Sequence, residues 1–372
     1  MIKRIYIHNF RCFENFEFNI TGQQSSLLIG KNGSGKSTLR EVFKIFQSIG
    51  RGVTRVGQLV KQNDFCRGQT EIPMRFEMEI LLNSMFFSYM LVFELPERFQ
   101  ELRIKEERLS VDGEILFSRE QALVTLRRNA VQGNESQFNI DWHMVAMPVI
   151  QGPSASSSLG LFRDWLASMV LLAPIPKLMQ GDAEYGTKEP EEDASNWAHW
   201  LSGLLERYPA AYSTINQHLS QLMPDFESFR FERTVKEAKT LMVRFRNDHG
   251  EFESSSESLS DGEKCFFLCS VVLAANKYDG PLFTFWDEPE SHLSLNEISH
   301  FVLALRKGFQ QKGQLVMTSH NPEAIRRFSD DSTWVMGRHS HLEPTIIRQL
   351  QEVAPSSDLI QKLIDGDIEP WA

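Results

Sequence analysis

Cysteine is scarce in this sequence of 372 residues, which has four: Cys12, Cys66, Cys265 and Cys269. They are too few and too scattered for a disulfide framework in a chain of this size, which favours a reducing compartment. Cys265 and Cys269 are one helical turn apart, but no second pair of Cys or His stands at metal-ligand spacing. We therefore expect both in the core rather than at a metal site.

Long hydrophobic runs and sustained heptads are also missing. The most apolar window, MFFSYMLVFEL from Met85, is too short to span a bilayer and is rich in strand-forming residues. The N-terminal segment MIKRIYIHNFRCFENFEF alternates apolar and polar residues as a pair of strands does, unlike a signal peptide. We expect a cytoplasmic protein with no membrane partner and no coiled-coil arms.

A surplus of basic residues is absent as well, because 39 Lys and Arg stand against 49 Asp and Glu, a formal charge of −10. This charge disfavours a surface that tracks nucleic acid broadly, although a local basic groove stays open. With 41% hydrophobic and 24% charged residues, the composition is that of a globular chain with one large or two moderate domains.

The stretch LLIGKNGSGKSTLREVF, from Leu27 to Phe43, carries the clearest chemistry. Its start is a short apolar strand, and its end has apolar residues at helical spacing. Between them the pattern Gly-x-x-x-x-Gly-Lys-Ser is that of a P-loop, which binds nucleotide phosphates through backbone N–H groups. The residues of this predicted nucleotide site are Gly30, Lys31, Asn32, Gly33, Ser34, Gly35, Lys36, Ser37 and Thr38.

Two side chains of the P-loop have separate predicted tasks. Lys36 meets the terminal phosphates, and Ser37 offers its hydroxyl to Mg²⁺. A chance Gly/Ser turn is the alternative, and the flanking strand and helix argue against it. A nucleotide with Mg²⁺ is therefore expected here.

Two further motifs follow in order. In SLSDGEKCFFLC, Ser260 and Gly262 stand at the start of a long apolar helix, where a hydroxyl and free N–H groups can bind the γ-phosphate of a nucleotide held elsewhere. A helix cap is the alternative for Ser260. The apolar strand PLFTFW then leads into Asp287 and Glu288, of which the first can hold Mg²⁺ through water and the second can orient an attacking water.

A last apolar strand, QLVMTS, ends next to His320. Ligands bind beyond the carboxyl ends of strands in open α/β sheets, so we expect His320 to sense the γ-phosphate, with a capping or core histidine as the alternative. The predicted catalytic residues are Lys36, Glu288 and His320, and the predicted metal ligands are Ser37 and Asp287.

Together these motifs resemble those of ABC-type P-loop ATPases, with LSDGE as the signature, FTFWDEPE as the Walker B segment with its catalytic glutamate, SHLS as the D-loop and TSH as the switch histidine. The opening IYIHNFRCFENFEFNI is similar to the RecF, SMC and OLD-like branch of AAA-family ATPases. The resemblance covers about residues 1–95 and 250–345. It implies ATP as the nucleotide and puts Arg11 near the phosphates, with a solvated strand charge as the alternative.

Two features depart from the transporter-type pattern. Asp261 and Glu263 stand where that pattern has Gly and Gln, which resembles the OLD-like signature and adds acidity beside a phosphate. Weaker or slower dimerisation is expected to follow. The glutamine of the family's Q-loop stays unassigned among Gln58, Gln62 and Gln69.

The expected fold is α/β, an ABC-type ATPase head with a mixed sheet, helices and an N-terminal antiparallel β part. The expected segments are 1–95, the N-terminal part of the ATPase domain; 96–250, a mainly helical insertion acting as a lid or partner-binding region; 251–345, the C-terminal part; and 346–372, a tail. Within the insertion, 151–160 and 181–196 are predicted to be mobile loops.

The resemblance implies an ATP-hydrolysing switch, in which ATP stabilises a dimer by lying between the P-loop of one subunit and the signature of the other. We expect a homo-oligomer with at least an ATP-dependent dimer, a separate effector protein and a role in defence against phage or plasmids. DNA contact and the oligomeric state beyond a dimer unit stay open. The alternatives are a DNA repair or maintenance ATPase of RecF/SMC type, a self-contained OLD-type nuclease and a transporter ATPase subunit. The nuclease would need a Glu and an Asp-x-Asp cluster, which the residues after His320 do not show.

Overall fold

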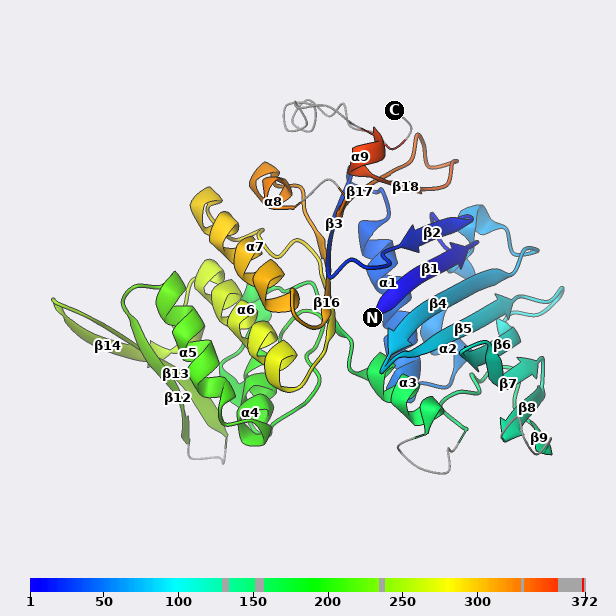
Figure 1. The fold of residues 1–372 in the computed structure, drawn as a ribbon, viewed down its shortest axis with the longest axis horizontal. Helices are drawn as coiled ribbons and strands as arrows, with labels where there is room; N and C mark the ends of the chain where they lie inside the picture. The colour runs from blue at the N-terminus through cyan, green and yellow to red at the C-terminus, as the bar shows by residue number, and fades with distance from the viewer. Residues whose placement is uncertain (129–133, 151–156, 234–237, 329–330, 354–369, 371–372) are drawn as a thin grey trace.

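The computed structural model describes residues 1–128, 134–150, 157–233, 238–328, 331–353 and 370. Two lobes lie on either side of a central, mostly parallel sheet (Figure 1). Part of the predicted 151–160 loop, residues 151–156, lies outside the described residues, as do 354–369 and 371–372 of the predicted tail.

The central sheet has the strand order β10-β15-β16-β3-β17-β18, in which β18 runs antiparallel to β17 and all other pairs are parallel. Its strands are β3 (Ser25–Ile29), β10 (Val170–Leu172), β15 (Phe283–Trp286), β16 (Gln314–Thr318), β17 (Thr333–Gly337) and β18 (Ile346–Gln349). The parallel strands are almost wholly buried, as a sheet covered on both faces requires. Their carboxyl ends share one edge, where a ligand can bind.

An antiparallel sheet with the order β2-β1-β4-β5-β6-β7-β8-β9 dominates one lobe. Its strands are β1 (Ile2–His8), β2 (Phe16–Asn19), β4 (Met74–Leu82), β5 (Met85–Glu94), β6 (Arg103–Val111), β7 (Glu114–Glu120), β8 (Leu123–Arg128) and β9 (Asn134–Asn139). Alternating burial along β2 and β4 gives this sheet one covered face. The core on that face includes α1 (Lys36–Gly50) and α3 (Ser158–Ala167), which lie between the two sheets (Figure 1).

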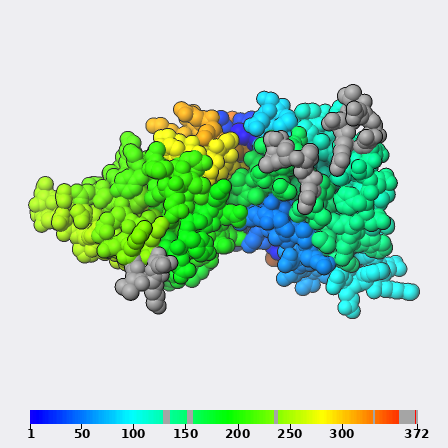
Figure 2. Space-filling model, turned by 90° about the horizontal axis from the view of Figure 1, so that it is seen from below, coloured from blue at the N-terminus to red at the C-terminus, as the bar shows by residue number. Residues whose placement is uncertain are grey.

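Helices cover the other face of the central sheet. A second core contains α4 (Trp197–Arg207), α5 (Ala211–Leu222), α6 (Asp261–Tyr278) and α7 (Leu295–Phe309). Beyond them, a small antiparallel sheet consists of β11 (Asp182–Ala183), β12 (Phe226–Arg233), β13 (Lys239–Asn247) and β14 (Gly250–Ser255). We call β11–β14 together with α4 and α5 the arm. Figure 2 shows the tip of the arm, in yellow-green, at the end opposite the N-terminal sheet, in cyan.

Short helices complete the described fold. They are α2 (Val56–Leu59), α8 (Pro322–Arg326), α9 (Leu350–Val353), η1 (Gln62–Asp64), η2 (Cys66–Gly68), η3 (Pro176–Leu178) and η4 (Ser256–Ser258). In the parts of the chain that the structure describes, no helix has the length and apolar character needed to cross a membrane.

The predicted α/β fold with an N-terminal antiparallel part is confirmed. The strand pair predicted in the N-terminal segment is β1 and β2, and the apolar strand predicted before the P-loop is β3. Cys265 and Cys269 are buried and free, which confirms them as core residues. The tail prediction is wrong for residues 346–353, which form β18 and α9.

The prediction of a mainly helical insertion over 96–250 is wrong. β6–β9 extend the N-terminal sheet, β10 joins the central sheet, and β11–β14 form the sheet of the arm. Within the insertion, the three- and four-residue spacing of apolar residues in LFRDWLASMVLLA predicts a helix, but this run splits into α3 and β10. A short, fully buried strand has no polar alternation and cannot be distinguished from a helix by periodicity alone.

The acidic stretch 181–196, predicted to be mobile, is tied to the fold by its backbone. The N–H of Ala173 donates to the carbonyl of Glu192 at 2.8 Å. Thr187 crosses α4 at Gly203, where an added Cβ would lie 2.3 Å from the Thr187 carbonyl oxygen. Composition did not reveal these contacts because backbone atoms make them.

We predict that Gly203→Ala destabilises the protein by about 1–3 kcal/mol, because the new methyl group must displace the backbone of Thr187. Helix propensity alone predicts the opposite, a gain of about 1 kcal/mol in α4. Gly57→Ala in α2 is the control, since nothing lies within 4 Å of its Cβ position. Urea denaturation checks the prediction, and a Gly203→Ala variant as stable as wild type would contradict this packing.

Candidate functional site

The P-loop joins the carboxyl end of β3 to the start of α1. Gly30, Gly33 and Gly35 have φ angles of 151°, 80° and 103°, which L side chains rarely adopt. Gly35 is also closely packed, because an added Cβ would lie 2.8 Å from Sγ of Cys12. A glycine turn of this kind leaves backbone N–H groups free at a helix N-terminus, a geometry that suits a phosphate.

Lys36 is the first residue of α1 and is 6% exposed. Its ammonium group donates to the carbonyl of Gly30 at 2.7 Å and lies 3.4 Å from that of Lys31. Burial lowers the pKa of Lys36, while the carboxylates of Glu288 and Asp287 act in the other direction. The amine therefore has carbonyl partners that phosphate oxygens can replace.

Asp287, just after β15, accepts hydrogen bonds from several elements. Ser37 Oγ donates to its carboxylate at 3.0 Å, and Thr318 Oγ1 donates at 2.5 Å. Arg40, one turn after Ser37 on α1, pairs with the same carboxylate and also with Glu192, at 2.9 Å from Nε. A hydroxyl and a carboxylate side by side are hard oxygen ligands, so Ser37 and Asp287 fit Mg²⁺.

Glu288 and His320 lie at the same edge of the sheet. The N–H of Glu288 donates to Thr318 Oγ1 at 2.9 Å, and its carboxylate lies 3.2 Å from Nε2 of His320. Burial lowers the pKa of His320 and Lys36 lowers it further, against the effect of Glu288 and Asp287. The neutral imidazole is therefore favoured beside the carboxylate.

A cavity of about 350 Å³ collects most of the predicted nucleotide site. Its lining residues are Arg11, Cys12, Asn32, Gly33, Gly35, Lys36, Ser37, Thr38, Glu288 and Arg338. Arg11 borders the P-loop as the resemblance implied, but its Nε is paired with Asp64 at 2.8 Å. Lys31 and Ser34 line a smaller cavity on the adjoining side of the loop.

The signature residues open onto a different cavity, of about 530 Å³, which Ser260 and Gly262 line together with His292 of the D-loop. Ser260 is the N-cap of α6, where its Oγ accepts from the N–H of Glu263 at 3.3 Å and donates to the Glu263 carboxylate at 2.7 Å. This is a capping box. The helix cap and the γ-phosphate ligand are both compatible with this position.

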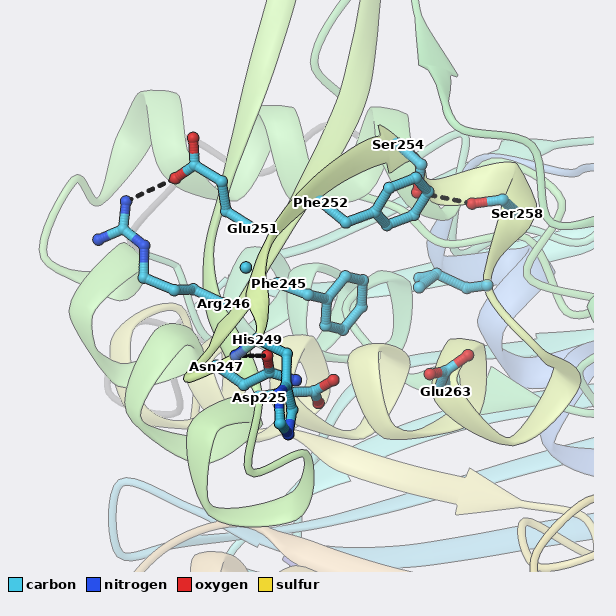
Figure 3. A pocket seen from close by; sticks show the side chains of 12 residues that line it. Asp225, Phe245, Arg246, Asn247, His249, Glu251, Phe252, Ser254, Ser258 and Glu263 are labelled. Atoms are coloured by element: carbon cyan, nitrogen blue, oxygen red, sulfur yellow. Dashed lines mark hydrogen bonds and ion pairs between the residues drawn. The ribbon is translucent and has the colours of Figure 1, made fainter.

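A further hollow, of about 430 Å³, continues the signature surface onto the arm (Figure 3). It lies between the β13–β14 hairpin and the start of α6, and Glu263 borders both hollows. Phe245 and Phe252 line it, and Phe252 is 64% exposed. The arm therefore presents an aromatic surface next to the signature.

None of the three candidates for the Q-loop glutamine lies at this edge of the central sheet. Gln58, Gln62 and Gln69 belong to α2, η1 and the end of η2, and none of them lines the cavities described above. Instead, Ala173 and Pro174, which follow β10, line the cavity beside the Walker B aspartate. The Q-loop glutamine therefore stays unassigned.

Motif matching also missed Arg40, Glu192 and Arg338. The helical spacing of Arg40 from Ser37 could have indicated that both share one face of α1. Glu192 is paired with Arg40 and Lys44, at 2.9 and 2.6 Å. No local pattern marks Glu192 or Arg338. Glu192 is held by the hydrogen bond from the N–H of Ala173 to its carbonyl, and Arg338 reaches the site through the pairing of β17 with β3.

Comparison with known proteins agrees with this geometry. Residues 25–326 match the family model described as "AAA domain, putative AbiEii toxin, Type IV TA system". The chain belongs to this family. An AAA domain fits the P-loop that the sequence predicted, and the fold is similar to that of SMC head domains. A search of curated proteins found no match.

Solved SMC heads share the fold of this AAA-domain protein. The SMC head domain from Thermotoga maritima has a TM-score of 0.51 at 15% identity, covering 94% of this chain and 98% of that chain. An SMC head bound to the C-winged helix domain of ScpA has a TM-score of 0.55 at 12% identity and the same coverage. The Smc head with an extended coiled coil, bound to the C-terminal domain of ScpA derived from Pyrococcus furiosus, has a TM-score of 0.53 at 11% identity, covering 98% of each chain.

Glu290, the last residue of the Walker B segment and directly before the D-loop, is a buried acid to which the motifs assign no role. It is 6% exposed, one carboxylate oxygen accepts from Ser319 Oγ, and Oε2 has no hydrogen-bond partner among the described residues. Burial raises the pKa of Glu290 to about 7, against the effect of the Ser319 hydrogen bond. Since Ser319 precedes His320, this contact ties the D-loop to the strand end that carries the histidine.

Glu290→Gln should remove a pH dependence of stability. The proton leaves the unfolded glutamate near pH 4.5 and the folded one near pH 7, so the free energy of unfolding falls as pH rises through this window. We expect Gln to stabilise the ligand-free protein by about 1–3 kcal/mol at about pH 8, with most of the gain gone at about pH 4.5. Denaturation across pH measures this, with the exposed Glu257→Gln as control. If Glu290→Gln and wild type differed in free energy of unfolding by the same amount at both pH values, Glu290 would not be a titrating buried acid.

Proposed function

We propose that this protein is an ATP-hydrolysing switch that closes as a dimer over ATP and controls a separate effector. One observation carries the proposal. Lys36 and Glu288 line the P-loop cavity, whereas Ser260 and Gly262 line the signature cavity. The two cavities have no lining residue in common. In this proposal, the signature that contacts the γ-phosphate comes from a second copy. A two-fold dimer gives two such composite sites.

Each residue of the site has a task in hydrolysis. Lys36 and the P-loop N–H groups hold the phosphates and stabilise the charge that develops on them. Glu288 orients a water and accepts its proton, as the water oxygen bonds to the γ-phosphorus and the bond to the β-phosphate oxygen breaks. His320, 3.2 Å from Glu288, donates to a γ-phosphate oxygen. Ser37 and Asp287 would hold Mg²⁺, which would supply positive charge beside the phosphates.

A defence role is supported by the family description, which names an AbiEii toxin and a Type IV TA system. We therefore propose that the switch acts in the cytoplasm against phage or plasmids. The SMC heads bound to ScpA domains support a separate partner on a head of this fold. The arm, with Phe252 exposed beside the signature, is our candidate for the effector contact.

A DNA maintenance ATPase of RecF/SMC type is the second candidate, which the fold of SMC heads favours. DNA binding that requires ATP and weakens with rising salt would support it. A self-contained nuclease would need a cluster of metal ligands. The described residues contain no group of three or more His, Cys, Asp or Glu side chains that could hold a metal ion.

Glu288→Gln should trap the ATP-bound dimer. The amide keeps the shape of the side chain but cannot take the proton of the attacking water, so we expect hydrolysis to fall about 100-fold or more while ATP binding persists. Light scattering should show a dimer with Mg·ATP and a monomer without it. Lys36→Ala, which removes a phosphate contact, is the control that should stay monomeric. Wild-type turnover by Glu288→Gln would show that Glu288 is not catalytic.

A further inference from the structure

A second arginine enters the P-loop cavity from an element that none of the motifs covers. Arg338 is the first residue after β17 and lines the cavity together with Gly33 and Lys36. A Cβ on Gly33 would lie 3.5 Å from Nη2 of Arg338. The guanidinium therefore lies against the loop that is expected to hold the phosphates.

Strand pairing brings Arg338 to this place, because β17 is the parallel neighbour of β3. Val335 stands opposite Ile29, and a Cβ on Gly30 would meet the carbonyl oxygen of Met336 at 2.1 Å. The two strands end side by side, one leading into the P-loop and the other into Arg338. Both are buried in the central sheet, so this relation is fixed by the core.

The loop that carries Arg338, residues 338–345, is fastened by its backbone. The N–H of Thr345 donates to the carbonyl of Cys12 at 2.8 Å, and Arg67 donates to the carbonyl of Leu342 at 2.8 Å. These bonds tie the loop to the N-terminal lobe, on the side where Cys12 lines the cavity. The position of the loop therefore does not depend on the arginine side chain.

The guanidinium of Arg338 has no partner among the described residues, unlike the other cations of the cavity. Lys36 donates to Gly30, and Arg11 is paired with Asp64, whereas no other described residue makes a hydrogen bond, ion pair or ring contact with Arg338. The residue is half-buried. A guanidinium has five N–H donors and no acceptor, so leaving it unpaired in a cavity costs free energy.

We propose that Arg338 binds the polyphosphate of the nucleotide in its own chain, as a second phosphate-binding cation beside Lys36. The inference rests on the proposed function. Phosphate oxygens match the planar fork of a guanidinium and accept two charge-assisted hydrogen bonds from it. Because Arg338 acts within one chain, it contributes to nucleotide binding by the monomer, whereas Ser260 contributes only in the dimer.

Binding of Mg·ADP to the full chain tests this role, because ADP lacks the γ-phosphate that the second copy would contact. We expect Arg338→Ala to weaken Mg·ADP binding about tenfold or more by calorimetry, and the loss to shrink as salt screens the charge. Arg338→Lys should recover part of the affinity, since it keeps the charge and loses the fork. Arg348→Ala, which removes an exposed arginine from the neighbouring strand β18, is the matched control and should bind as wild type does.

The outcomes separate this role from the P-loop itself. Unchanged Mg·ADP affinity in Arg338→Ala, with binding lost in Lys36→Ala, would overturn the role of Arg338 and leave the proposed function standing. Normal binding by Lys36→Ala would instead remove the proposed function. Weaker ATP-dependent dimerisation with unchanged Mg·ADP affinity would assign Arg338 to the subunit contact and overturn the proposal. Thermal melting confirms folding, and an affinity loss in a folded Arg338→Ala that Arg338→Lys partly restores supports phosphate binding.

Discussion

The carboxylate of Asp287 connects the elements that form the candidate site at the edge of the central sheet. It accepts from Ser37 on α1 and from Thr318 at the end of β16, and it pairs with Arg40. This convergence is possible because β3, β15 and β16 are parallel neighbours whose carboxyl ends share one edge. Removing the carboxylate would leave a guanidinium and two hydroxyl groups without their common acceptor in a part of the fold with little exposure.

Arg40 extends this interaction toward the arm. Its guanidinium also pairs with Glu192, whose backbone carbonyl accepts from Ala173 at the end of β10 and whose carboxylate pairs with Lys44. Glu192 lies in the stretch between β11 and α4, two elements of the arm. This chain of ion pairs therefore connects the carboxyl-end edge of the central sheet to the arm.

Sequence alone predicted the parts of the site that lie within a few neighbouring residues, namely the P-loop glycines, Asp287 with Glu288, and His320. Each is carried by a strand whose apolar run is visible in the sequence. The helical insertion failed as a prediction because β6–β9 and β10 find their partners in strands far away in the chain. Arg338 could not be found for the same reason: nothing in GRHSHLEP indicates a phosphate contact, and only the pairing of β17 with β3 brings it to the P-loop.

The central claim is that two chains build each ATP site. Its most direct test is ATP hydrolysis by purified mixed dimers, in which one tagged chain carries Lys36→Ala and the other carries Ser260→Arg. Each homodimer lacks part of every site, whereas the mixed dimer keeps one intact P-loop facing one intact signature. We predict no hydrolysis by either homodimer and about half of wild-type activity in the mixed dimer if the sites fire independently, or a measurable single turnover if they do not. A mixed dimer without even a single turnover would contradict the shared site and leave Ser260 as a helix cap.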